Sequence, residues 1–300
     1  MKSWNFNTGH KIDSTATIDE MLDIAGLNWK VETSPITYGT FNELQSENKK
    51  AAYRSDTGAL LDIYLNRIPN QNKTMLTMFD QFLKKADLAI DTIGSTQKGA
   101  NIYASALLPE TFDINPKAVG DITKARLVIS DSHLNGVGLS VSVHYDRLIC
   151  TNGMTTKVSQ EVGVIHHNGV IQAATVDKVL SYALQSVKVK RDVYDVLSDK
   201  PISIEQAITL LIASFGDSDK SVSEQPEIVQ TCLRLFQSDA IGGDLLTSYH
   251  TAYGLLNSVT EYFNHHSKVK SEENRFSSLL SGSMGKVQNK FQSQLVRAFC

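Results

Sequence analysis

The chain has 300 residues, of which 41% are hydrophobic and 20% are charged, and its formal net charge is −3 at pH 7. This is the composition of an ordinary soluble chain, and its length makes two lobes a reasonable expectation. The near-neutral charge excludes a protein that attracts nucleic acid over its whole surface, so any such site must be a local basic patch.

Cysteine usage and hydropathy indicate the cellular compartment in which the chain is expected. Cys150, Cys232 and Cys300 are an odd number at unrelated spacings with no CxxC pair, which excludes a disulfide framework or a zinc cluster and fits a reducing compartment. The opening MKSWNFNTGHKIDS has no apolar signal region, and no run approaches the roughly 18 apolar residues of a membrane helix. We therefore expect a cytoplasmic protein without membrane contact.

The first 115 residues mix helix and strand signals. Residues 15–29 predict a short helix, because Thr17 is a good N-cap and Glu20 lies three residues later. The segments that follow are an extended stretch up to residue 65 with a turn at 56–58, a helix over 73–88 with apolar residues at helical spacing, and a strand over 99–114.

Residues 124–156 carry the clearest β signal. The runs ARLVISDSH and LSVSVHYDRLICTN are rich in β-branched residues and are joined by LNGVG, which predicts a hairpin with a glycine-containing tip. Strand alternation places Leu139, Val141, Val143 and Tyr145 on one face, and Ser140, Ser142 and His144 on the other.

Helical patterns dominate the rest of the chain. They cover residues 175–197 and 201–215 and, beyond the small polar segment 215–227, most of the remainder. We predict an α+β fold: an N-terminal body of β-hairpins with packed helices over residues 1–200, and a mostly helical C-terminal region over 201–300. The segment 215–227 is a candidate flexible linker.

Distinctive blocks run almost from end to end. They are MLDIAGLNWKVETSPI, YRSDTGALL, RIPNQN, KGANIYASALLPETFDI, ISDSHLNGVGLSVSVHYDRLICTNGM, GVIHHNGVI, TAYGLLNSVTEYFNHHSK and RFSSLLSGS. In this order they resemble the prophage- and plasmid-borne phage/plasmid-like protein family, catalogued as domain of unknown function 932. The resemblance implies a mobile-element setting, commonly near replication and recombination genes, and it implies no particular activity.

The stretch GLLNSVTEYFNHH combines an apolar helical pattern with a polar stripe. His250, Asn257, Glu261 and His265 fall on roughly one side of a helix. Glu261 and His265, four residues apart, can converge on one divalent ion. A metal or catalytic site, a recognition or buried structural stripe, and a solvated face all remain open. We expect the stripe to dock against the body or a neighbouring subunit.

Other polar residues allow a metal-dependent nuclease as a less favoured hypothesis. Asp131, His133, His166 and His167 can supply ligands for Mg²⁺ or Mn²⁺, although such sites usually rest on several carboxylates. The alternative is that these residues cap turns and satisfy backbone groups. The sequence contains no nucleotide-binding glycine signature or nucleophile elbow. We therefore predict no catalytic residues, no bound metal and no cofactor.

Basic residues are better organised, and lysine and arginine neutralise phosphates without reading base sequence. One set shares a side of the last helix, another lies in SVKVKRD, and an aromatic residue beside an arginine near the end of the central hairpin can stack on an unpaired base. An ordinary solvated helix face explains the same charges. The candidate nucleic-acid contacts are Tyr145, Arg147, Lys188, Lys190, Arg191, Lys286, Lys290 and Arg297.

The leading hypothesis is a non-enzymatic nucleic-acid-binding protein of a phage or plasmid, acting on single-stranded DNA in recombination or replication. The fold pattern is compatible with phage single-strand annealing proteins, which suggests a homo-oligomer and host or phage recombination proteins as partners. The alternative is an accessory or anti-defence factor that binds a host protein and has no affinity for nucleic acid.

Overall fold

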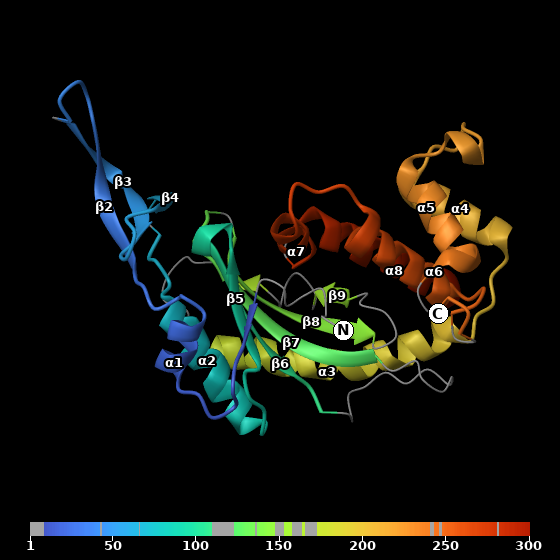
Figure 1. The fold of residues 1–300 in the computed structure, drawn as a ribbon, viewed down its shortest axis with the longest axis horizontal. Helices are drawn as coiled ribbons and strands as arrows, with labels where there is room; N and C mark the ends of the chain where they lie inside the picture. Colours follow the sequence, from blue (N-terminus) through green and yellow to red (C-terminus); the bar gives the residue numbers. More distant parts are fainter. Residues whose placement is uncertain are drawn as a thin grey trace.

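The structure is a computed structural model (Figure 1). It describes residues 9–42, 44–65, 67–109, 123–135, 137–147, 153–157, 164–165, 173–240, 243–245, 248–280 and 282–300.

A seven-stranded antiparallel sheet forms the centre of the molecule. Its order is β1-β5-β6-β7-β8-β10, and β9 also pairs with β8. The strands are β1 (Gly9–Lys11), β5 (Thr92–Thr96), β6 (Asn101–Leu107), β7 (Thr123–Ser132), β8 (Leu139–Arg147), β9 (Gly153–Lys157) and β10 (Val164–Ile165). The pairing of β7 with β8, in which Ile129 faces Val141, confirms the predicted central hairpin.

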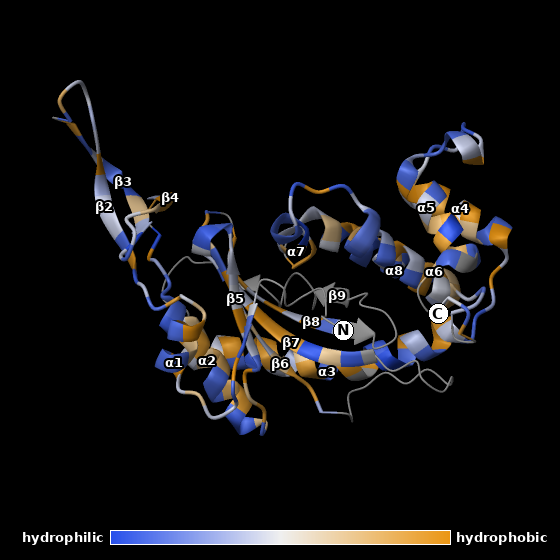
Figure 2. Ribbon diagram, in the orientation of Figure 1, coloured by the Kyte–Doolittle hydropathy of each residue, from blue (hydrophilic) through white to orange (hydrophobic). Residues whose placement is uncertain are grey.

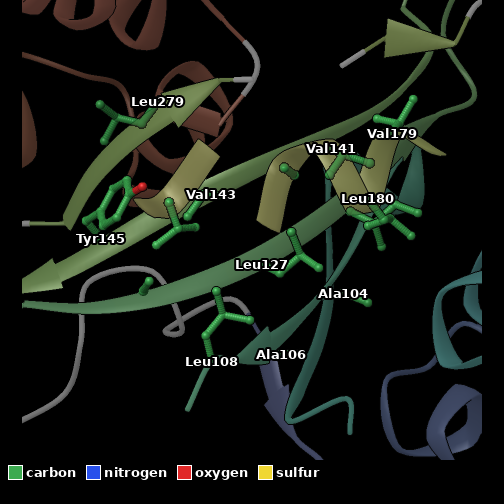
Figure 3. Close-up of a cluster of buried hydrophobic side chains, with 14 of the residues drawn as sticks. Ala104, Ala106, Leu108, Leu127, Val141, Val143, Tyr145, Val179, Leu180 and Leu279 are labelled. Atoms are coloured by element: carbon green, nitrogen blue, oxygen red, sulfur yellow. The ribbon is translucent and has the colours of Figure 1, made fainter. Parts of the chain in front are cut away.

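The two faces of the sheet differ in chemistry, as strand alternation predicts. Leu139, Val141 and Val143 belong to the hydrophobic core, together with residues of α2 (Asn72–Lys85) and α3 (Ala173–Ser198) (Figures 1 and 3). The opposite face carries buried polar side chains and a small apolar cluster, in which Tyr103 and Val128 meet Phe276 and Leu280. Helices therefore cover both sides of the sheet.

The N-terminal part adds a helix and a separate sheet. In α1 (Ile18–Ile24), Thr17 and Glu20 form a capping box, as the sequence predicts. β2 (Val31–Tyr38), β3 (Leu44–Arg54) and β4 (Leu60–Leu65) make a three-stranded antiparallel sheet. Its β2–β3 hairpin projects from the body as an arm (Figure 1).

The C-terminal region is helical, as predicted. It contains α4 (Ile204–Phe215), α5 (Glu227–Arg234), α6 (Ala252–Glu261), α7 (Glu272–Leu280) and α8 (Ser283–Phe299). In the same region, a short 3-10 turn lies at Val222–Glu224, and π-helical turns at Leu235–Asp239 and Tyr262–His266 extend α5 and α6. A second 3-10 turn, Gln97–Gly99, lies in the central sheet between β5 and β6. None of the helices in the described ranges combines the length and hydropathy that crossing a membrane requires.

The segment proposed as a linker is an anchored connection. Gln225 is 3% exposed and accepts a hydrogen bond from the backbone of Asp217, and its amide donates to the carbonyls of Asp217 and Lys220. These bonds hold the ends of α4 and α5 together.

The α+β prediction is confirmed, but the two predicted parts share one core. A single hydrophobic cluster extends from Ile12 to Leu295 and joins the sheet to α3, α6 and α8. Figure 2 shows hydrophobic residues gathered where α2, β6 and β7 meet. Residue 200 therefore marks a change in secondary structure within a continuous interior.

Candidate nucleic-acid interface

The α8 helix has one buried face and one basic face. Its buried residues include Phe291 and Leu295, which join the common core. At 100° per residue, Lys286, Lys290 and Arg297 lie on the opposite side, and all three are exposed. We call these three residues the α8 basic face.

The α8 helix itself contains no carboxylate side chain that could pair with its basic face. The 17 residues of α8 include no Asp or Glu, so the helix carries +3 in a chain of net charge −3. Across the described part of the chain, the three side chains make no ion pair within 4.0 Å. The face therefore presents three cations at helical spacing to an anionic ligand.

The second basic cluster lies on α3 and is less available. Arg191 is exposed, but Lys190 is half-buried, with its Nζ 5.6 Å from the ring centroid of Tyr194. Burial lowers the pKa of Lys190 to about 7. A lysine that is only partly charged at neutral pH is a weak phosphate ligand. The side chains of Lys188 and Arg147 lie outside the described part of the structure.

The lowered pKa of Lys190 predicts a pH-dependent stability. The unfolded chain holds this proton up to the ordinary pKa of 10.5, whereas the folded chain releases it near pH 7. Since the unfolded state then binds more protons, the free energy of unfolding rises with pH over this window. We expect Lys190→Met to remove that rise, so that its stabilising effect is largest below pH 7 and shrinks towards pH 10.

Urea unfolding at about pH 6 and pH 9 measures this difference. The exposed Lys178 on the same helix provides the control Lys178→Met, which removes the same charge. An effect of Lys190→Met that is equal at both pH values would show that the amine of Lys190 keeps its proton.

Tyr145 was wrongly predicted as a base-stacking residue. Its side chain is 1% exposed, and its ring lies 5.7 Å from that of Tyr194 within the core (Figure 3). Burial raises the pKa of its hydroxyl. The ring shares the face of Leu139, Val141 and Val143, and strand alternation could have indicated its burial.

The polar stripe around α6 is divided between interior and surface. All residues of α6 are buried, including Asn257 and Glu261 at 2% and 3% exposure. His250 is half-buried and stacks on Tyr249 and Phe236. The alternative that the stripe is a solvated face is therefore wrong for Asn257 and Glu261.

His265 lies at the exposed end of this stripe, and partial desolvation by the surrounding protein, the largest influence, lowers its pKa. The Glu261 carboxylate lies 3.8 Å from Nε2 of the neighbouring His266. In the described ranges, no group of three or more His, Cys, Asp or Glu side chains is placed to hold a metal ion.

The central hairpin tip uses its polar residues to join parts of the fold. The Asp131 carboxylate accepts a hydrogen bond from Asn70, and Nε2 of the fully buried His133 lies 2.9 Å from Asn72. Arg67 donates to the carbonyls of Ser132 and Leu134. These contacts agree with a structural role for Asp131 and His133, which is the alternative to the binding of a metal ion. His166 and His167, the other proposed ligands, lie outside the described residues.

We call these contacts, together with the hydrogen bond from the Tyr64 hydroxyl to the His133 carbonyl at 2.8 Å, the polar joint. The residues of RIPNQN were not predicted as partners of the hairpin tip. They lie about sixty positions away in the chain, and no local pattern in the sequence indicated this contact.

Comparison with known proteins gives one finding. A family model described as a domain of unknown function, DUF932, matches residues 68–280. No curated protein and no solved structure matches the chain.

Proposed function

The chain belongs to the DUF932 family, whose description states no activity, and we propose that it is a non-enzymatic nucleic-acid-binding protein that holds phosphates on the α8 basic face. The observation that carries this proposal is the outward direction of Lys286, Lys290 and Arg297 on a helix without carboxylates. Cations arranged in this way replace the counterions of a phosphate backbone and bind it without reading bases.

The proposed contact set is smaller than the sequence suggested. Tyr145 is buried, and Lys190 is half-buried with a pKa of about 7, so neither supports binding. Arg191 is exposed and stays in the set with the α8 basic face. The supporting evidence is thus electrostatic, and backbone binding is the activity that it favours.

A preference for single-stranded DNA, and a cytoplasmic role in phage or plasmid recombination or replication, form the finer part of the proposal. This part rests on the family resemblance and on analogy with annealing proteins. A protein that holds the backbone through one helix face leaves the bases of a single strand available for pairing. Annealing would use that property.

Fluorescence anisotropy of a labelled single-stranded oligonucleotide, titrated at about 50 and 200 mM salt with a duplex control, tests the proposal. We expect binding that weakens with salt and favours the single strand. Equal affinity for the duplex would remove the single-strand part and keep backbone binding. Absence of binding at the lower salt concentration would overturn the proposal and favour the protein-interaction alternative, which a host-partner pull-down then examines.

A further inference from the structure

A stack of three aromatic rings leads from the core to the surface just before α6. Phe236 is 5% exposed, and the centroid of its ring lies 5.5 Å from that of His250, with 24° between the two planes. The ring of Tyr249 lies 4.3 Å from the same His250 ring, at 14°. Tyr249 is 56% exposed, so the stack ends at the surface in a flat aromatic side chain. We call these three residues the aromatic stack.

The backbone holds Tyr249 and His250 in this arrangement. Side chains of consecutive residues diverge in a strand or a helix, since successive residues turn by about 180° or 100°. His250 instead has a φ of +50°, in the left-handed region that few residues other than glycine adopt. Its carbonyl accepts a hydrogen bond from the amide of Ile202 at 2.9 Å, and Pro201 forms a β-bridge with Thr251. The Tyr249 ring is therefore positioned before a ligand arrives, which lowers the entropic cost of binding.

An exposed cation lies next to the aromatic stack in the fold. The carbonyl of Lys200 accepts a hydrogen bond from the amide of Ala252 at 2.9 Å, so Lys200 runs alongside the segment that carries the stack. Lys200 is exposed and, in the described part of the chain, forms no ion pair within 4.0 Å. A nucleotide whose base lies on Tyr249 would thus have a lysine nearby for a neighbouring phosphate.

The α8 basic face extends to the same end of the molecule. Figure 1 shows the C-terminal ends of α3 and α8 together, and the side-chain amide of Gln292 donates to the hydroxyl of Tyr194 at 3.4 Å, which joins the two helices there. Arg297 lies in the last turn of α8, and Lys200 lies two residues beyond α3. A strand that leaves the α8 basic face at this end therefore continues toward the aromatic stack.

We propose that the exposed ring of Tyr249 stacks on an unpaired base of the strand whose phosphates the α8 basic face holds. This inference rests on the proposed nucleic-acid binding and adds a contact with a base to it. Every base has a flat π-face, so such a contact increases affinity without reading sequence. Bases within a duplex are already stacked and paired, so a contact of this kind also favours single strands.

Oligonucleotides with and without bases test this contact separately from phosphate binding. Fluorescence anisotropy at about 50 mM salt compares a labelled single strand with an abasic strand of the same length, which keeps the phosphates. We expect Tyr249→Ala to weaken binding of the normal strand on the order of ten-fold and to leave binding of the abasic strand unchanged. The slope of log K against log salt should stay that of the wild type, because no phosphate contact is lost.

Tyr249→Phe keeps the ring and should bind within about two-fold of the wild type. Tyr38→Ala is the matched control, since Tyr38 is 53% exposed and lies on the arm, where residues 31–48 include no lysine or arginine. It should bind like the wild type, and circular dichroism should show that all variants remain folded. A Tyr249→Ala variant that binds as tightly as the wild type, or a Tyr249→Phe variant as weak as Tyr249→Ala, would overturn the stacking contact and leave backbone binding in place. A wild type that binds neither strand would overturn both proposals.

Discussion

Replacing Lys286, Lys290 and Arg297 together with alanine is expected to weaken oligonucleotide binding on the order of 10²-fold at about 50 mM salt. The three cations are exposed and face away from the core, so their removal leaves the packing of α8 intact. A single strand loses about 0.7 in the slope of log K against log salt for each lost phosphate contact. The slope of the triple variant should therefore be shallower by about 2.

A control with the same change in net charge separates local contact from overall electrostatics. Lys73, Lys84 and Lys220 have 58%, 73% and 53% exposed side chains, and each pairs with a carboxylate outside α8. Their combined replacement with alanine should leave the salt slope unchanged. Equal slopes for the α8 variant and the wild type would remove this helix from the proposed interface.

Gly254→Ala is expected to cause the largest loss of stability among single substitutions of the α6 region. A Cβ at Gly254 would lie 1.8 Å from the carbonyl oxygen of Ser248, because this backbone segment packs directly on the helix. All residues of α6 are buried, so the clash is relieved only by moving α6 or the segment around Ser248. We expect a loss of about 3 kcal/mol or more.

For a chain of 300 residues, a loss of about 3 kcal/mol corresponds to a decrease in melting temperature of roughly 5 °C. Gly58→Ala provides the comparison. It makes the same substitution in the β3–β4 turn, where nothing lies within 4 Å and φ is +68°. There only the left-handed backbone opposes the change, at about 1–2 kcal/mol. A Gly254→Ala variant as stable as Gly58→Ala would contradict close packing at Ser248.

Much of the secondary structure was predictable because its signals are local. Each capping box lies within four consecutive residues, one from Thr17 to Glu20 and the other from Ser203 to Gln206. The alternation from Leu139 to Tyr145 similarly separated the two faces of β8, and the structure places the face of Leu139 in the core. Such patterns depend on backbone geometry that neighbouring residues set among themselves.

The candidate interface was predictable only in part. Helical periodicity placed Lys286, Lys290 and Arg297 on one side of α8, and the structure leaves that side exposed. Periodicity alone did not reveal that Lys190, in the same kind of pattern, is half-buried beside Tyr194. Which side of a helix faces solvent depends on the elements that pack on it, and these come from distant parts of the chain.

The sequence by itself determined the α+β class, the central hairpin and the positions of most helices, because turns, caps and apolar periods act over a few residues. Only the tertiary structure decided that Lys190 is half-buried beside Tyr194, that α6 is buried all round, and that RIPNQN bonds to the hairpin tip. It also decided that, among the described strands, β2, β3 and β4 form a sheet of their own. These outcomes depend on which distant surfaces meet, and that choice is made by the packing of the whole chain.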